Sequence, residues 1–219
     1  MAFKATANGQ YVSGPATGFA FQKGGVAFWM KTSSTNVDMV PISRWQSNSR
    51  QGWGFIINNS PGKIAGVGYS SGPPAMSCNS TGSVNDGNWH HILLNFDGAT
   101  SGAGQMYIDG VPDGTNSLTG TWALNPSGSP LALFDNNDGY WPTFIGSLAE
   151  MVEIYGRNFT AGEIAALAKG FSPRRVVKRD STTTALAIWP MVRDMITIAG
   201  APTGVTNTSQ VDDHPRIYA

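Results

Sequence analysis

The sequence carries little charge for its length. Asp, Glu, Lys and Arg make up only 13% of the 219 residues, against about 25% in ordinary soluble proteins. The 14 basic and 14 acidic residues balance to a net charge of zero. A neutral chain lacks the long-range attraction that draws basic proteins to nucleic acid or to anionic membranes. We therefore expect neither a nucleic-acid nor a membrane partner.

Cysteine and long apolar stretches are also scarce. Cys78 is the single cysteine, which excludes an intramolecular disulfide. The first eight residues contain no apolar run behind a basic start, as a signal peptide would, and no stretch approaches the length of a membrane span. We expect the protein to be made in a cytoplasm, and to reach any outside location by lysis or as part of a particle.

Turn-forming residues are abundant instead, with 27 Gly and 13 Pro beside a hydrophobic fraction of 41%. Short β-branched and aromatic runs separated by such residues predict an all-β domain with a substantial core. The expected strands cover residues 26–31, 39–45, 53–58, 63–69, 89–96, 105–109, 131–134, 144–155 and 185–192. The Ser-, Gly- and Pro-rich segment 70–83 is expected to be a loop or an irregular edge. Asp109-Gly110 predicts a tight hairpin turn.

One short helix is indicated after the last core strand. Thr160 and Glu163 have the spacing of a capping box, Phe159 and Ile164 that of a hydrophobic staple, and Gly170 supplies a C-terminal stop. The chain beyond it is rich in turn residues and poor in apolar ones. We therefore divide the chain into a sandwich domain over residues 1–172 and a C-terminal extension over 173–219, which packs on the sandwich or on a neighbouring subunit.

Two blocks of sequence carry a family resemblance. In the first, a Gly-Asn-Trp-His-His-Ile run (87–92) precedes Phe96-Asp97-Gly98 and a Tyr-Ile-Asp-Gly hairpin (107–110). In the second, Phe144–Glu150 leads to Ile154–Arg157 and the capped helix. Their order resembles the laminin-G-like jelly-roll of the concanavalin A-like lectin/glucanase superfamily. The resemblance implies a two-sheet antiparallel jelly-roll sandwich that binds rather than catalyses.

The C-terminal part resembles the endings of jelly-roll proteins encoded by phages. The residues that carry this likeness are 186–194, around Trp189-Pro190, and the closing His214–Tyr218. It implies a virion structural protein, with a capsid decoration protein as the first hypothesis. Its partners would be the major capsid protein and copies of itself, a trimer by analogy. The alternative is a carbohydrate-binding lectin domain, tail-associated or free, that recognises cell-surface glycans.

Catalytic and metal-binding patterns are weak in this sequence. Glu150 and Glu153 are three apart, so on a regular strand they face opposite sides and do not form the carboxylate pair of a glycosidase. His90 and His91 are adjacent and point to opposite faces of a strand, so they cannot readily share one metal ion. There is no hydrolase elbow and no phosphate-binding loop. We assign no catalytic residue, no metal and no cofactor.

Aromatic residues near turns are the candidates for sugar binding. Trp45, Trp53, Tyr140 and Trp141 could form a stacking platform, and we select Tyr140 and Trp141 as the carbohydrate-binding residues. The adjacent loop, Asp135–Gly139, carries hard oxygen donors for Ca²⁺ but lacks the spacing of an EF-hand, which favours an ordinary polar turn. A basic run, finally, is a candidate contact for an acidic partner or else a solvated linker; its cations are Arg174, Arg175, Lys178 and Arg179.

Overall fold

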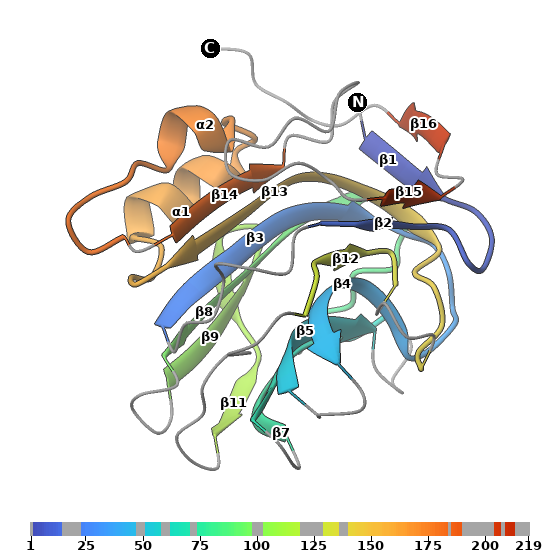
Figure 1. The fold of residues 1–219 in the computed structure, drawn as a ribbon, viewed down its shortest axis with the longest axis horizontal. Helices are drawn as coiled ribbons and strands as arrows, with labels where there is room; N and C mark the ends of the chain where they lie inside the picture. The colour runs from blue at the N-terminus through green and yellow to red at the C-terminus, as the bar shows by residue number, and fades with distance from the viewer. Residues whose placement is uncertain are drawn as a thin grey trace.

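The computed structural model describes residues 2–14, 23–46, 51–57, 62–70, 74–97, 103–118, 129–135, 140–183, 185–189, 204–206 and 209–212. Two antiparallel sheets pack face to face, and two short helices lie on the outer side of one of them (Figure 1). The predicted two-sheet jelly-roll sandwich is therefore confirmed.

The first sheet, called sheet A, contains eight of the described strands. Seven follow one another in the order β10-β9-β8-β3-β13-β1-β16, and β14 pairs with β13. Their bounds are β1 Ala2–Ala5, β3 Lys23–Lys31, β8 Trp89–Asp97, β9 Ala103–Ile108, β10 Val111–Asp113, β13 Gly146–Tyr155, β14 Ala185–Trp189 and β16 Ser209–Asp212.

The second sheet, called sheet B, also contains eight described strands, in the order β11-β7-β6-β5-β4-β12-β2-β15. Their bounds are β2 Tyr11–Ser13, β4 Met39–Gln46, β5 Gln51–Ile57, β6 Ile64–Ser70, β7 Pro74–Asn79, β11 Thr115–Leu118, β12 Ala132–Leu133 and β15 Gly204–Thr206. Strand β7 corrects the expectation of a loop or an irregular edge over residues 70–83: residues 74–79 pair with both β6 and β11 despite their turn-rich composition.

The core lies between the sheets because every second residue of a strand points to the same face. Strand β3 sends Val26, Phe28 and Met30 inward, and these meet inward residues of sheet B such as Phe55. The rings of Phe28 and Phe55 are 4.8 Å apart in an edge-to-face arrangement. Strand β8 is apolar along nearly its whole length because it is buried on both faces: Leu94 lies in the core between the sheets, and Leu93 is buried on the outer face.

Two helices cover that outer face of sheet A, whereas the sequence predicted a single helix. Helix α1, Ala161–Ala168, has the expected capping box between Thr160 and Glu163, and it buries Ile164 and Leu167. The second, α2, is a single turn over Pro173–Val176 with Pro173 at its first position. It was not predicted because four residues are too few to show a helical period. None of the described helices is long and apolar enough to cross a membrane.

The chain beyond residue 172 contributes strands to both sheets. Strand β14 pairs with β13 through Met151↔Trp189 to Tyr155↔Ala185, β15 pairs with β2, and β16 pairs with β1. Trp189 is 1% exposed and belongs to the core between the sheets. The domain division at residue 172 stays a prediction, and residues 190–203 and 213–219 lie outside the described part.

Candidate functional site

An aromatic cluster lies on the outer face of sheet B. It consists of Trp45 on β4, Tyr69 on β6, and Tyr140 and Trp141 on the segment before β13. The ring centroids are 4.2 Å apart for Trp45–Tyr69, 5.5 Å for Trp45–Trp141 and 5.1 Å for Tyr140–Trp141. The cluster is graded in exposure: Trp45 is buried, Tyr69 and Trp141 are half-buried, and Tyr140 is 69% exposed.

A glycine on the intervening strand brings Trp45 and Tyr69 together. Gly52 on β5 pairs with Trp45 on one side and with Tyr69 on the other, so the two aromatic residues are two strands apart. Such positions are separated by about 10 Å at the backbone, and the two side chains close this gap to a ring-centroid distance of 4.2 Å. Gly52 has a φ of +118°, and a Cβ there would lie 1.8 Å from the carbonyl oxygen of Arg44.

Backbone hydrogen bonds hold the segment of Tyr140 and Trp141 against sheet B. The Val40 N–H donates to the carbonyl of Pro142 at 3.2 Å, and the Phe144 N–H donates to the carbonyl of Phe134 at 2.8 Å. Trp141 also packs on an apolar patch of the outer face of sheet B, made of Val40, Ile56, Ala65 and Val67. The two residues selected from the sequence therefore lie side by side on an anchored segment.

The cluster differs from the predicted platform in one member, since it contains Tyr69 and not Trp53. Trp53 is 1% exposed and belongs to the core between the sheets, so its inclusion in a surface platform was wrong. Its strand position decides this, because Trp53 faces inward next to the outward Gly52. Tyr69 was missed. The available signal was the alternation Ala65, Val67, Tyr69 on one face of β6, which becomes informative only once the pairing of β5 with β6 is known.

The possible Ca²⁺ loop is only partly described. Residues 136–139 lie outside the described part; Asp135 is half-buried and accepts a hydrogen bond from the Thr143 hydroxyl at 3.5 Å. Among the described residues, no group of three or more His, Cys, Asp or Glu side chains has the arrangement of a metal site.

The two glutamates considered for catalysis lie on an irregular part of β13. Glu150 has a φ of 47°, and the register with β3 shifts between Ala149 and Val152, which marks a β-bulge. The regular alternation that we assumed between Glu150 and Glu153 therefore does not hold. Glu153 points between the sheets, where its fully buried carboxylate pairs with Arg44 of β4 at 3.0 Å. That carboxylate is enclosed in the core and cannot reach a bound polysaccharide.

His90 is held between two carboxylates at the edge of the sandwich. Its Nδ1 lies 2.8 Å from Asp109 and its Nε2 lies 3.1 Å from Asp86. The hydrogen bond with Asp109 is the main reason that the pKa of His90 is raised above its ordinary value; the bond with Asp86 adds to this and burial opposes it. His91 lies on the opposite face, with its ring 5.3 Å from that of Trp29.

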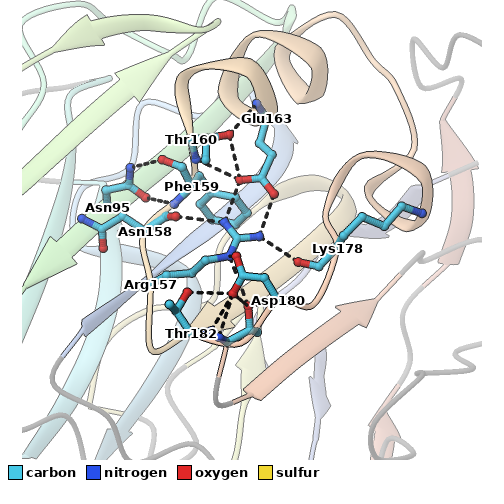
Figure 2. A network of polar contacts seen from close by, with 10 residues as sticks. Asn95, Arg157, Asn158, Phe159, Thr160, Glu163, Lys178, Asp180 and Thr182 are labelled. Atoms are coloured by element: carbon cyan, nitrogen blue, oxygen red, sulfur yellow. Dashed lines mark hydrogen bonds and ion pairs between the residues drawn. The ribbon is translucent and has the colours of Figure 1, made fainter.

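The basic run is exposed on α2 and the segment after it. Arg174, Arg175, Lys178 and Arg179 all have exposed side chains. Figure 2 shows that Lys178 contributes its backbone carbonyl to a polar network while its side chain extends away from it; the carbonyl accepts from Arg157 Nη2 at 2.8 Å. Arg157 also pairs with Glu163 at 2.7 Å and with Asp180 at 3.1 Å. The network fixes the segment that carries the cations.

The two stacked antiparallel sheets define a jelly-roll β-sandwich. The family comparison agrees, since residues 6–165 match the model of a laminin-G family described as the concanavalin A-like lectin/glucanases superfamily. The chain belongs to this family.

Two curated relatives are similar in sequence. The mouse "Sushi, von Willebrand factor type A, EGF and pentraxin domain-containing protein 1" is 33% identical over 132 residues, which is 57% of this chain and 4% of the relative. The rat protein is 30% identical over 131 residues, with the same coverage. The matched region is thus a small fraction of these long proteins.

Solved structures share the fold at low sequence identity. A putative carbohydrate-binding protein from Bacteroides ovatus gives a TM-score of 0.66 at 14% identity, covering 97% of this chain and 60% of that one. A heptameric pentraxin from Limulus polyphemus gives 0.58 at 15% identity, covering 91% and 93%. The sialidase domain CBM40 of Ruminococcus gnavus, bound to α2,3-sialyllactose, gives 0.55 at 13% identity, covering 76% and 97%.

Proposed function

We propose that this protein is a non-enzymatic module that binds carbohydrate through the aromatic cluster. The observation that carries the proposal is the graded stack in which exposed Tyr140 rests edge-on against Trp141, itself packed on Trp45. An aromatic ring with one face open and its body fixed by packing offers a rigid apolar surface at small entropic cost. Sugar rings present apolar C–H faces that fit such a surface. The names of the Bacteroides and Ruminococcus neighbours support the same class of ligand.

The non-enzymatic part of the proposal rests on Glu153. A glycosidase needs two carboxylates facing a cleft, and the Glu153 carboxylate is enclosed between the sheets beside Arg44. The jelly-roll relatives named above as binding proteins agree with this view.

A glycan array followed by calorimetry tests the proposal. We expect Tyr140→Ala and Trp141→Ala each to weaken binding of the best neutral glycan about tenfold, which corresponds to about 1.4 kcal/mol. Val111→Ala is the matched control, because Val111 is also a large exposed apolar residue, at 63% exposure, and lies on the β9–β10 hairpin of sheet A. Neutral-glycan binding that survives both aromatic substitutions would contradict the cluster as the site. An array without any binder would contradict carbohydrate binding altogether.

The exposed basic segment supports a second candidate, capsid decoration in a phage virion. Four exposed cations on a segment held by the Arg157 network could contact an acidic face of the major capsid protein or of another copy of this chain. The phage-like ending is the second support. On this proposal the protein is located in the virion, with a trimer as the expected assembly.

Immuno-electron microscopy of the producing phage tests the second candidate. We expect the antibody to label particles of the unmodified phage. Label should be lost when the four cations of this protein are all replaced by serine, in the quadruple variant Arg174→Ser, Arg175→Ser, Lys178→Ser and Arg179→Ser. Particles without label in the unmodified phage would refute a virion location. Label that survives the quadruple change would refute the basic segment as the contact.

A further inference from the structure

A cavity of about 390 Å³ lies at one end of sheet A. Its walls come from the end of β1, the end of β3 with the turn that follows, and the start of β13. Among the described residues that line it, two are cationic, five carry hydroxyls and none is acidic. The cations are Lys4 and Lys31, and the hydroxyl-bearing residues include Thr32, Ser34 and Ser147.

The two lysines stand in one row across the sheet. Lys4 on β1 pairs with Ser147 on β13, and Ser147 pairs with Lys31 on β3. Residues in register on adjacent strands share a face, so all three point to the same side. That side is the outer face, because the neighbours Phe3 and Met30 belong to the core between the sheets. Two strand spacings separate the lysines by about 10 Å at the backbone.

The small residue between the lysines leaves room for a ligand. Ser147 is buried at 1% exposure and forms the floor. At the neighbouring Gly146 a Cβ would lie 2.5 Å from the carbonyl oxygen of Lys31, so the position excludes any larger residue. Two half-buried ammonium side chains thus flank a low floor, an arrangement that suits an oxyanion reached from both sides.

The hydroxyl-rich wall is held in place by its own hydrogen bonds. The Thr32 hydroxyl donates to the carbonyl of Ile145 at 2.7 Å and accepts from the Ser34 N–H at 3.0 Å. The Gly87 N–H donates to the carbonyl of Thr32 at 3.0 Å, and the Asn85 amide donates to the carbonyl of Ser34 at 3.3 Å. The wall is therefore preformed, which lowers the entropic cost of binding.

We propose that this pocket, named here the lysine pocket, binds an acidic saccharide through a sulfate or carboxylate group placed between Lys4 and Lys31. The cavity is larger than a free inorganic anion needs, and its hydroxyls can exchange hydrogen bonds with sugar hydroxyls. Trp89 is the next residue of the same row, beside Lys31, and adds an aromatic neighbour. The saccharide part rests on the proposed function, whereas the anion part does not.

Calorimetry with four probes tests this proposal on the full chain. The probes are a chondroitin sulfate tetrasaccharide, its desulfated form that keeps the carboxylates, neutral chitotetraose, and sodium sulfate. We expect one or both acidic tetrasaccharides to bind at least tenfold more tightly than the other two probes, and to bind more weakly as salt rises. The desulfated form distinguishes a carboxylate from a sulfate as the recognised group. If sodium sulfate binds as tightly as the acidic tetrasaccharides, the saccharide part of the proposal is overturned.

Variants assign that binding to the lysine pocket. We expect Lys4→Gln with Lys31→Gln to weaken acidic-tetrasaccharide binding at least tenfold, and Lys4→Arg with Lys31→Arg to keep it, at unchanged melting temperature. Arg174→Gln with Arg175→Gln is the charge-matched control on α2 and should have no effect. An equal loss in that control, or no loss in the lysine pair, would overturn the proposal.

The aromatic variants separate this inference from the proposed function. Tyr140→Ala and Trp141→Ala should leave acidic-tetrasaccharide binding unchanged, because Trp141 packs on the outer face of sheet B, whereas the lysine pocket lies on the outer face of sheet A. If they abolish it, the lysine pocket is overturned while the aromatic cluster gains support. If neutral glycans never bind but the acidic probe binds through the lysines, the aromatic cluster fails and the lysine pocket stands.

Discussion

The guanidinium of Arg44 and the carboxylate of Glu153 form an ion pair inside the sandwich that joins its two sheets. Nη2 lies 3.0 Å from Oε2 and Nε lies 3.1 Å from Oε1, and the two side chains are 1% and 0% exposed. Arg44 belongs to β4 of sheet B and Glu153 to β13 of sheet A, 109 residues apart in the chain. A buried charge of this kind is tolerated only with its partner, because each ion has lost its hydration.

Removal of one partner should destabilise the fold strongly. Glu153→Gln leaves the Arg44 charge buried without its counter-ion, and we expect a loss of about 3–5 kcal/mol in the free energy of unfolding. Urea denaturation followed by tryptophan fluorescence measures it. The double change Arg44→Met with Glu153→Leu removes both charges and should recover most of that loss. A single substitution that costs less than about 1 kcal/mol would show that water or another group compensates the charge.

Stability should depend on pH through His90. Its raised folded pKa means that the folded protein holds the proton more tightly than the unfolded chain, whose His pKa is about 6.5. The stabilisation is therefore fully present below about pH 6.5 and is lost as the pH rises through the folded value. Its partners stay ionised in that window, since hydrogen bonds from Asn88 are the main cause that lowers the pKa of Asp86 to about 2.

The comparison with His90→Gln measures this effect. We expect the difference in unfolding free energy between the native chain and the variant to be largest near about pH 5.5 and to shrink toward about pH 8.5. Urea titrations at pH intervals give the curve. A difference that stays constant over this range would mean that His90 contributes by packing and not by its charge.

The features that the sequence predicted are the local ones. The capping box of Thr160 and Glu163 closes over four residues, and the Asp109-Gly110 turn joins β9 directly to β10, so neighbouring residues decide both. Both were confirmed. The edge strands β15 and β16 were missed because three or four residues are too few to show a recognisable period.

The non-local features could not be predicted from the residues alone. The contact of Trp45 with Tyr69 depends on Gly52 pairing with both, and the Arg44–Glu153 pair depends on which face β4 and β13 turn toward each other. A one-residue change of register would reverse each outcome. The bulge at Glu150 is an example. It breaks the regular in-and-out alternation of β13 from which we had predicted that Glu150 and Glu153 face opposite sides.

Arg157 should control the local stability of the segment from α1 to β14. Its guanidinium binds Glu163 through two bonds, Nη1–Oε2 at 2.8 Å and Nη2–Oε1 at 2.7 Å, and also donates to the carbonyl of Lys178 (Figure 2). We expect Arg157→Ala to cost about 1.5–3 kcal/mol, the range for hydrogen bonds to charged groups. Hydrogen exchange should accelerate over residues 160–183 first. Arg157→Lys should restore little, because an ammonium cannot reproduce the two-pronged contact; full rescue by Lys would contradict this role.

The Cys78 thiol should be inert in the folded protein. Cys78 is 1% exposed on β7, and burial raises the pKa of its thiol to about 12. At pH 8 about one thiol in ten thousand is then ionised, and only the thiolate attacks a disulfide reagent. We expect Ellman's reagent to react with the native chain many times more slowly than with the chain in guanidinium chloride, which serves as the control. The residual rate should follow unfolding, so the destabilised Glu153→Gln variant should react faster at the same pH. Rapid labelling of the native chain would mean that β7 separates from β6 and β11 far more readily than their paired register suggests.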